Sequence, residues 1–570
     1  MGPRIDARYR ARAAELGPPR LDHPGLAAVA ALRCGRTRRE LSLATASDAV
    51  SGRFTFHGKS RELGNGDAVD WQHPELNEGT RLWKTQLHEF SYALDLADAA
   101  RTTGDRAFHD RLVTLISDWS RVSPIGHKGF ALDVWNARAV ATRLINWSIA
   151  AAILEVRPAD PLFEQFDAQL AVHALFLADN LELDLRGNHL LRDYVGLVFC
   201  HELLGSAPNA LALLRTELDE QLLEDGCHFE RSPLYHSIVL QDLVECRALL
   251  AEAAPDWLSE SIARMAGFLA YLLPEDRQLP LHGDTWHGEV DPSRVLEEAG
   301  NATIPPRPGL PERASGIVAL ESGPTRALLL AGAHGPDYQM GHTHADGLSF
   351  ELYRGPGRVI TDTGTCTYNP GPRRIRVRST AAHNTVQIDG EEQLEAWGSF
   401  RAGRRGRGRV RARGSSGSWD WIWATHDGYR WLRGKPLHHR LLAVSESSAI
   451  VLDWIGGGGT HNIRTALHLH PDAVDNEIEI APMTGTAGTA TVELHERFNE
   501  SRQMTEIFVE TTAELPWLGG WAVDFQPGES GLDLDAQYEA NHVQVSCKTG
   551  AGRTTVSWDL DAAQVEFSPH

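Results

Sequence analysis

Cysteine is scarce in this sequence, and its spacing excludes two classes of small stabilised domain. The six cysteines among 570 residues stand singly, with no C-x-x-C pair. That spacing argues against a zinc ribbon and against a dense disulfide framework. Cys200 and Cys246 lie within apolar segments of helical spacing, so we expect them to be buried thiols. Reduced cysteines are the simplest interpretation.

Long hydrophobic runs are also absent. The first residues, MGPRIDARYRARAAELG, contain no apolar core of the signal-peptide type. No uncharged apolar stretch of about 20 residues, the length that a membrane helix needs, follows anywhere. We therefore expect no membrane partner. As written, the sequence favours a cytoplasmic protein, and an exported one if a leader has been removed.

Positive charge is in deficit, since 55 Lys and Arg stand against 76 Asp and Glu, a formal net charge of −21. Nucleic-acid binders usually carry a basic excess or a dominant basic face, so we expect no nucleic-acid partner. An acidic ligand would need a locally positive cleft.

Residues 401–413 hold seven arginines. We favour an exposed edge strand protected by charge for this segment, with an anion-binding strip as the alternative.

The length of the chain indicates two or more domains, because single cores stop growing at about 250–300 residues. Between residues 87 and 273, apolar residues recur three and four apart, with short breaks at Gly, Pro, Asp or Asn. This pattern predicts sequential helices packed as antiparallel pairs. After residue 315, short alternating or β-branched runs separated by turn residues predict antiparallel strands up to the end.

Four segments follow from these patterns. Residues 1–70 form an N-terminal extension and residues 71–275 a helical domain. Residues 276–314 form a connection rich in Pro, Gly and acidic residues, and residues 315–570 form an antiparallel β-sheet domain.

The segment GHTHADGLSFEL predicts a metal site. His342, His344 and Asp346 alternate, and alternate side chains of an extended chain share one face. Asp362 ends the next apparent strand, and His383 ends the segment after it. Two histidines and a carboxylate, with a position left for water, form a common zinc set. We choose His344, Asp362 and His383 as the ligands of Zn²⁺. Hydrogen-bonded histidines in β-turns are the alternative.

The segment DGCHFERSPLYH surrounds a tyrosine with charged groups. Tyr235 stands near an expected helix start, beside Arg231, His228, His236 and Glu230. A phenol titrates near pH 10, and nearby cations favour the phenolate. Such a tyrosine can accept a proton at mild pH. The alternative is a tyrosine that only caps or staples a helix.

The segment RGNHLLRDYVGL places Asn188 and His189 where one helix ends and another begins. Asparagine is a good helix N-cap, which is one explanation for Asn188. The functional explanation is a pair of donors for a substrate carboxylate.

Several aromatic and imidazole rings in the helical region could line a sugar groove, because sugar rings stack on indoles. Most aromatic residues on helices belong to the core. Trp135, with Arg138 nearby, is the best candidate, and His88 is another.

Taken together, four stretches resemble the heparinase II/III family of polysaccharide lyases. They are PELNEGTRLWKTQLHEFSYALDLADA, GNHLLRDYVGL, DGCHFERSPLYH and the region from GHTHADGLSFEL to STAAHNTV, all between about residues 75 and 390 and in the family's order. One departure is Gly187, where family members often have a second asparagine. This leaves the choice of substrate open.

The resemblance implies an α+β multidomain fold, with an N-terminal (α/α) incomplete toroid, a C-terminal antiparallel β-sandwich and a substrate cleft between them. It implies that Tyr235 is the catalytic base and that His342 faces it, with the acid left open between these two. Asn188 and His189 would neutralise a uronate carboxylate, and the zinc would be structural. The remaining residues expected to contact substrate are Arg231, Glu230, His236, Trp135, Arg138 and His88.

The implied activity is β-elimination on a uronic-acid glycan of the glycosaminoglycan type (heparan sulfate, hyaluronan or chondroitin), giving 4,5-unsaturated uronates. The expected partner is thus an acidic polysaccharide or oligosaccharide, and a homodimer is left open. Alternatives are a lyase for alginate or bacterial exopolysaccharide oligosaccharides, a glycoside hydrolase using paired acids such as Glu89, Asp225 and Glu230, a zinc-dependent hydrolase and a non-catalytic glycan-binding protein.

Overall fold

The computed structural model divides the chain into two compact units. The helical unit comprises Met1–Leu222, Ser237–Ala266 and Ser293–Ala302, and the β unit comprises Leu223–His236, Gly267–Pro292 and Thr303–His570. The structure describes residues 2–36, 39–64, 68–73, 76, 81–127, 129–300, 314–473, 478–527, 531–539 and 541–569.

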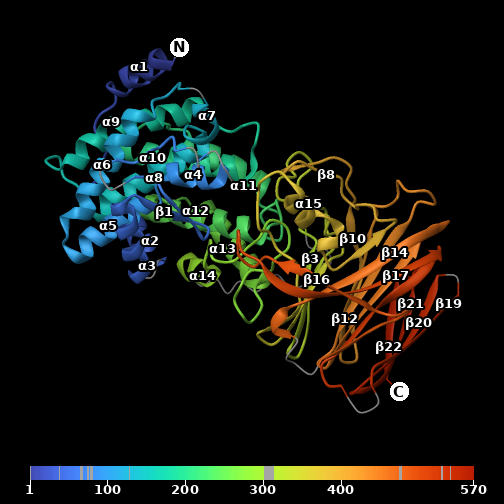
Figure 1. The fold of residues 1–570 in the computed structure, drawn as a ribbon. Helices are drawn as coiled ribbons and strands as arrows, with labels where there is room; N and C mark the ends of the chain where they lie inside the picture. Colours follow the sequence, from blue (N-terminus) through green and yellow to red (C-terminus); the bar gives the residue numbers. More distant parts are fainter. Residues whose placement is uncertain are drawn as a thin grey trace. The chain divides into compact units, whose positions relative to one another are not determined.

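Helices dominate the first part of the chain (Figure 1). They are α1 (Gly2–Ala13), α2 (Pro24–Arg36), α3 (Arg39–Ser51), α4 (Arg81–Glu89), α5 (Tyr92–Thr103), α6 (Arg106–Val122), α7 (Phe130–Asp133), α8 (Ala137–Ile153), α9 (Pro161–Asp179), α10 (Gly187–Leu204), α11 (Ala210–Gln221), α12 (Pro233–Leu250), α13 (Asp256–Leu272) and α14 (Pro292–Ala299). A hairpin of β1 (Arg53–Phe56) and β2 (Lys59–Glu62) follows α3. Helices α12 and α13 contribute residues to both units.

Helix α8 is the centre of the helical unit because almost every side chain along it is buried. It packs against α5, α9 and α10. Asn136 caps it by accepting a hydrogen bond from the backbone N–H of Ala139, as Asp105 and Asp160 cap α6 and α9. Among the described residues, no helix is long and apolar enough to span a bilayer.

The β unit contains two large antiparallel sheets. The first has the order β16-β17-β14-β6-β5-β4-β3, with β7 also paired to β14. The second has the order β10-β11-β12-β13-β18-β15. The strands of the first are β3 (Ile317–Ser322), β4 (Thr325–Leu330), β5 (Phe350–Arg354), β6 (Gly357–Ile360), β7 (Val386–Ile388), β14 (Thr460–Leu469), β16 (Gly488–Leu494) and β17 (Arg502–Glu514). Those of the second are β10 (Gly408–Ser416), β11 (Trp419–His426), β12 (Leu437–Val444), β13 (Ser448–Gly456), β15 (Glu479–Pro482) and β18 (Trp517–Asp524).

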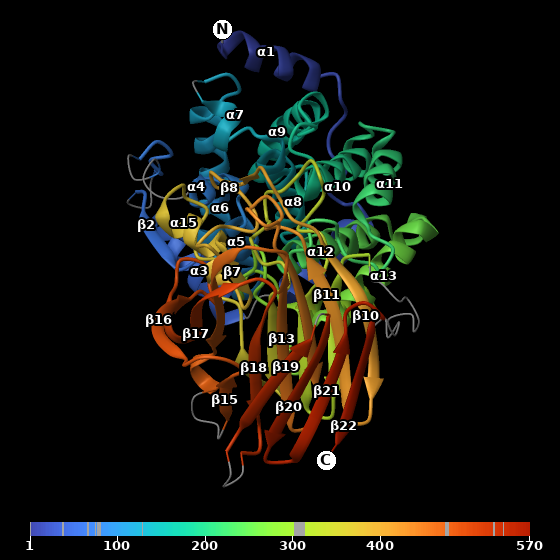
Figure 2. The same ribbon diagram turned by 90° about the vertical axis from the view of Figure 1, so that its right-hand side faces the viewer.

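A third sheet turns the expected sandwich into three layers. It consists of β19 (Asp533–Glu539), β20 (His542–Thr549), β21 (Gly552–Asp559) and β22 (Gln564–Pro569). One apolar core lies between the first and second sheets, and another lies between the second and third. In Figure 2 the third sheet is seen in the red strands near the C-terminus. The middle sheet is therefore covered on both faces, which explains why β13 and β18 are buried along almost their whole length.

The predicted succession of helices and antiparallel strands is confirmed. The units nevertheless divide the chain differently from the four predicted segments, because residues 1–70 cluster with the helical unit. Residues 223–236, which carry the tyrosine motif, cluster with the β unit. The predicted connection contains α14, and its residues 301–313 lie outside the described part of the chain. All six cysteines are unpaired, and Cys200 and Cys246 are buried as predicted.

Candidate active site

Tyr235 lies in the first turn of α12, where the local sequence fixes its position. Arg231 adopts a left-handed backbone conformation, with φ of 58°, and Pro233 begins the helix. The hydroxyl of Ser232 accepts a hydrogen bond from the backbone N–H of Tyr235 at 3.3 Å and donates one to the carbonyl oxygen of Asp284 at 2.8 Å. The start of α12 is thus hydrogen-bonded to the backbone at Asp284, which belongs to the same unit.

The ring of Tyr235 stacks on the imidazole of His342, with ring centroids 3.6 Å apart and planes 22° apart. The two hydroxyl oxygens of Tyr235 and Tyr368 lie 2.8 Å apart, within hydrogen-bonding distance. Burial, together with the negative charge of Asp284, raises the pKa of Tyr368 well above its usual value. Tyr368 therefore stays protonated and is able to donate to the Tyr235 oxygen.

His342 is held by Asp284, a fully buried carboxylate. Nδ1 of His342 lies 3.0 Å from Oδ2 of Asp284, and Nε2 lies 3.6 Å from Oε2 of Glu230. Burial alone would raise the pKa of the Asp284 carboxyl, but the Arg374 guanidinium and the histidine donors hold it well below its usual range. Because this carboxylate is ionised, Nδ1 of His342 carries a hydrogen in order to donate, and the other ring nitrogen, Nε2, faces Glu230.

Asp284 also binds two further groups. The Arg374 guanidinium contacts both of its carboxylate oxygens, one of them at 2.8 Å. Nε2 of His344 lies 2.9 Å from Oδ1. One carboxylate therefore orients both histidines of the H-x-H motif.

Three other residues that the sequence places beside Tyr235 (His228, His236 and Arg231) bond to other groups in the structure or are uncharged. Burial lowers the pKa of His228 to about 4, so it is not one of the cations expected to favour a phenolate. Nδ1 of His236 accepts a hydrogen bond from the backbone N–H of His228, and its ring packs against Phe268. Arg231 donates to the backbone carbonyl of Ser315.

A small cavity of about 30 Å³, large enough for a water molecule, lies beside His342. Glu230 and Arg231 line it together with His282 and Asp346. Two of the predicted substrate contacts and the predicted catalytic histidine thus share one polar hollow.

Asn188 and His189 belong to the helical unit. Asn188 follows the first residue of α10 and is not its N-cap, which is Arg186. Oδ1 of Asn188 accepts a hydrogen bond from Arg138 at 2.9 Å, and Nδ1 of His189 lies 2.8 Å from Glu182. The structure therefore joins Asn188 directly to Arg138, two residues that the sequence singled out separately.

Trp135 and His88 lie in the core of the helical unit. They are 2% and 1% exposed. The indole N–H of Trp135 donates to the Ser123 carbonyl, and Nδ1 of His88 accepts from Trp119. With so little surface, neither ring offers a face to a sugar in this structure. Helical spacing alone cannot separate a core ring from a groove ring.

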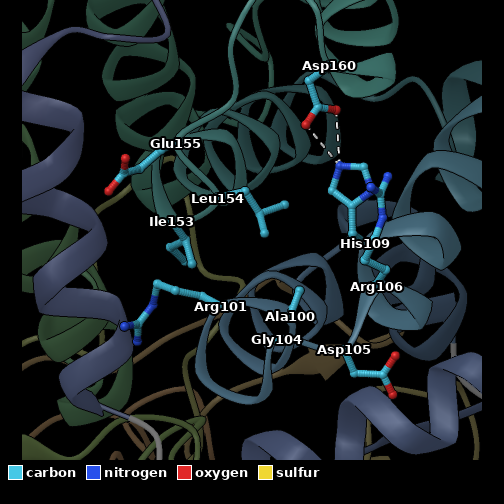
Figure 3. Close-up of a pocket in the computed structure, with 10 residues that line it drawn as sticks. All are labelled: Ala100, Arg101, Gly104, Asp105, Arg106, His109, Ile153, Leu154, Glu155 and Asp160. Atoms are coloured by element: carbon cyan, nitrogen blue, oxygen red, sulfur yellow. Dashed lines mark hydrogen bonds and ion pairs between the residues drawn. The ribbon is translucent and has the colours of Figure 1, made fainter.

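A larger hollow of about 390 Å³ lies elsewhere in the helical unit (Figure 3). His109 and Asp160 pair across it at 3.0 Å. None of the residues predicted to act in catalysis, in substrate binding or as metal ligands lines it, so we do not associate it with that chemistry.

The three predicted zinc ligands are buried in the β unit. Nδ1 of His383 lies 2.7 Å from Oδ2 of Asp362, and the rings of His344 and His383 are 5.4 Å apart. Nδ1 of His344 and Nε2 of His383 have no hydrogen-bond partner among the described residues. However, no group of three or more His, Cys, Asp or Glu side chains in the described ranges is placed to hold a metal ion. Asp362, which is bonded to the other ring nitrogen of His383, is placed like a carboxylate that orients a metal-binding histidine.

Sequence reasoning missed Asp284, Tyr368 and Arg374. Asp284 stands in HGDTWHGEVDP, which was interpreted only as a connection. Tyr368 and Arg374 stand inside the segment quoted for its histidines. The isolated HGD at residues 282–284, between α13 and α14, is the signal that could have pointed to Asp284.

Comparisons with known proteins agree on one family. The family model for the heparinase II/III N-terminus matches residues 28–301, and the model for the heparinase II/III-like C-terminal region matches residues 304–564. A heparin-sulfate lyase of Pedobacter heparinus is 22% identical over 390 residues, covering 61% of this chain and 58% of that protein. The FtsZ-localized protein C of Caulobacter vibrioides is 27% identical over 355 residues, covering 60% and 58%.

The fold agrees with a crystal structure of heparinase III, with a TM-score of 0.75 and 17% identity over 93% of this chain and 92% of that one. The curated relatives are matched over less than two thirds of their own length. Since the two family models together match nearly the whole sequence, the chain belongs to the heparinase II/III family.

Proposed function

We propose that this protein is a polysaccharide lyase that cleaves uronate-containing glycosaminoglycans by β-elimination. The observation that carries the proposal is the stacking of Tyr235 on a histidine whose Nδ1 is bonded to a buried, ionised carboxylate. Family membership and relatives named heparin-sulfate lyase support this reaction and favour heparan sulfate as the first substrate to test.

The chemistry follows from the weak acidity of the C5 hydrogen of a uronate. The Tyr235 phenolate would accept that proton and the C4–O4 bond would break. O4 would then receive either the same proton from Tyr235 or a proton from His342, which Tyr235 would afterwards replace. A hydrogen bond donated by Tyr368 to the Tyr235 oxygen favours the phenolate form. No water is consumed, so the product retains a new C4–C5 double bond.

Charge develops on the uronate carboxylate when C5 loses its proton, and donors at that group lower the barrier. Asn188 and His189 remain our predicted donors for this carboxylate. In support of this role, Arg138 and Glu182 orient the two side chains, although Asn188 itself is 1% exposed. Glu230 and Arg231 remain candidate substrate contacts beside His342.

The first test is an ultraviolet absorbance assay, since a double bond conjugated to a carboxylate absorbs where the substrate does not. We expect activity on at least one of heparan sulfate, hyaluronan, chondroitin and alginate. Tyr235→Phe should abolish it without unfolding the protein, while the control Tyr538→Phe, at an exposed position of β19, should keep it. Saturated products without an absorbance change would select a hydrolase, and a fully active Tyr235→Phe protein would refute our assignment.

We also propose a structural Zn²⁺ bound by His344 and His383, with Asp362 as a ligand or as the group that orients His383. The two buried nitrogen atoms without hydrogen-bond partners among the described residues support it. When bound, the ion would stabilise the segment that carries His342.

Elemental analysis of the purified protein should therefore find about one zinc per chain, and chelation should lower the melting temperature. The control His461→Gln alters another buried histidine, in β14 and outside the proposed site, and should keep the metal. A protein that never binds zinc, or whose melting temperature ignores chelation, would overturn this proposal.

A further inference from the structure

Three large aromatic side chains are exposed on one hairpin and one loop of the β unit. The hairpin pairs β8 (Ala396–Trp397) with β9 (Arg401–Ala402). Trp397 is 52% exposed, Phe400 at the turn is 45% exposed, and Trp431 in the loop after β11 is 44% exposed. Exposed indoles are costly to leave in water, and a group of them indicates a binding surface.

Each exposed indole carries a stacked arginine. The guanidinium carbon of Arg401 lies 5.1 Å from the ring centroid of Trp397, and that of Arg404 lies 3.8 Å from Trp431. Within the described residues neither arginine forms an ion pair with a carboxylate, whereas the neighbouring Arg405 pairs with Asp337 at 2.9 Å. Nη2 of Arg404 donates to the backbone carbonyl of Glu392 at 3.4 Å, and its Nε is buried. The Arg401 guanidinium and the remaining Nη1 of Arg404 are the donors offered to an anion at the edge of an aromatic surface.

The hairpin is held rigidly by two buried arginines. Nε and Nη2 of Arg374 donate to the Ser399 carbonyl at 3.0 and 2.8 Å, and Nη1 of Arg378 donates to the carbonyl of Gly398 at 3.2 Å. Both arginines are 1% exposed. A fixed backbone presents its exposed side chains with little loss of entropy on binding.

The hairpin is also continuous with the candidate active site. The ring of Phe400 contacts that of Tyr368 in an edge arrangement, with centroids 5.1 Å apart. Tyr368 in turn bonds to Tyr235. Arg374 connects the same two places, since it binds both the hairpin turn and Asp284.

From this arrangement we propose that the hairpin and the loop form a subsite for the substrate chain, binding acidic sugar units next to those that are cleaved. Its members are Trp397, Phe400, Trp431, Arg401 and Arg404. The indoles and the phenyl ring would stack on the apolar C–H faces of sugars, and the guanidinium groups would pair with carboxylates or sulfates. The inference rests on the proposed lyase function.

Charge complementarity favours an acidic glycan over an apolar partner. The whole chain carries a formal charge of −21, so its average field repels a polyanion. Local cations are therefore needed wherever such a polymer is held. Arginine suits this role because its planar fork binds carboxylates and sulfates through two hydrogen bonds at once.

The test compares long and short substrates of one glycan. Heparan sulfate dodecasaccharides and tetrasaccharides are given to the wild type, to Trp397→Ala/Trp431→Ala and to Arg401→Ala/Arg404→Ala. We expect KM for the dodecasaccharide to rise about tenfold in each double variant, with kcat unchanged and KM for the tetrasaccharide altered less than about twofold. Tyr538→Ala removes an exposed aromatic ring from β19 and should change neither value.

The outcomes separate the subsite from the lyase function. If the wild type is active but both substrates respond equally, or neither responds, the subsite is refuted and the lyase function stands. If the wild type turns over no glycan, titration of its tryptophan fluorescence with the dodecasaccharide decides, and an affinity equal in wild type and variants refutes the subsite. A change of oligomeric state in the variants, seen by gel filtration, would instead assign the surface to a second copy of the chain.

Discussion

At the scale of single residues, the site depends on one carboxylate. Asp284 binds Arg374 and both histidines of the H-x-H motif, so it sets which nitrogen of His342 carries the hydrogen. Asp453 is a comparable group elsewhere in the β unit. It is fully buried and binds His438 at 2.7 Å and Arg440 at 2.8 and 2.9 Å. Asp284 binds one histidine more than Asp453, and of the two carboxylates it alone contacts His342.

We therefore predict that Asp284→Asn and Asp453→Asn lose similar stability but different activity. Each leaves a buried arginine without its counter-charge, which costs about 3–5 kcal/mol of unfolding free energy. Only Asp284→Asn should also lower kcat, by roughly 10²–10⁴-fold, because the histidine acting on the proton is misoriented. Urea denaturation and the absorbance assay, both below the melting temperature of the variants, measure the two effects. Equal loss of activity in both variants would contradict the assignment of Asp284 as a positioning residue.

At the scale of secondary-structure elements, the start of α12 decides where Tyr235 lies. A left-handed Arg231, the Ser232 hydroxyl and Pro233 together end the preceding turn and begin the helix. The same hydroxyl binds the backbone at Asp284. A helix cap thus also joins the tyrosine to the segment that orients His342.

We predict that Ser232→Ala lowers the unfolding free energy by about 1 kcal/mol, as for other lost helix caps. It should also reduce kcat more than it changes KM, because Tyr235 is no longer held against His342. Ser232→Thr keeps the hydroxyl and should restore both properties. Chemical denaturation and steady-state kinetics measure the changes. If Ser232→Thr behaves like Ser232→Ala, the hydroxyl is not the cause.

At the scale of the whole molecule, several arginines are interior hydrogen-bond donors, so not all of the positive charge reaches the surface. Arg374, Arg378 and Arg440 are each 1% exposed or less. Arg440, for example, donates to the Leu348 carbonyl at 2.6 Å as well as to Asp453. Such buried pairs make stability depend on carboxylates that stay ionised.

Acid should therefore weaken the fold in a defined range. Burial alone would raise the pKa of Asp453, but Arg440 and His438 lower it to about 2, whereas an unfolded Asp titrates near 3.9. Because the folded pKa is the lower one, this carboxylate stabilises the fold above pH 4, and its contribution is lost as the pH falls from about 4 to 2. The difference in unfolding free energy between the wild type and Asp453→Asn should shrink by about 2 kcal/mol over that range. Urea titrations at several pH values measure it, and a difference independent of pH would contradict the assignment.

Sequence alone determined the kinds of element and the principal motif, because local periodicity and turn residues act over short distances. The helical spacing predicted α8, the short apolar runs predicted the strands, and the motif around Tyr235 pointed to a phenolic base. The edge-strand interpretation of the arginine run holds for residues 408–413, which lie in β10 at the end of its sheet, whereas Arg401 and Arg404 precede that strand.

Only the tertiary structure decided which distant groups meet. Asp284 and Arg374 are 90 positions apart, and Tyr235 and Tyr368 are 133 apart. No local pattern encodes these pairs, because they depend on how strands and loops pack. For the same reason, the sequence could not show that Trp135, a predicted sugar-binding residue, belongs to the core. It also could not show that the exposed indoles of the hairpin and loop lie near the candidate site, which follows from the contact of Phe400 with Tyr368.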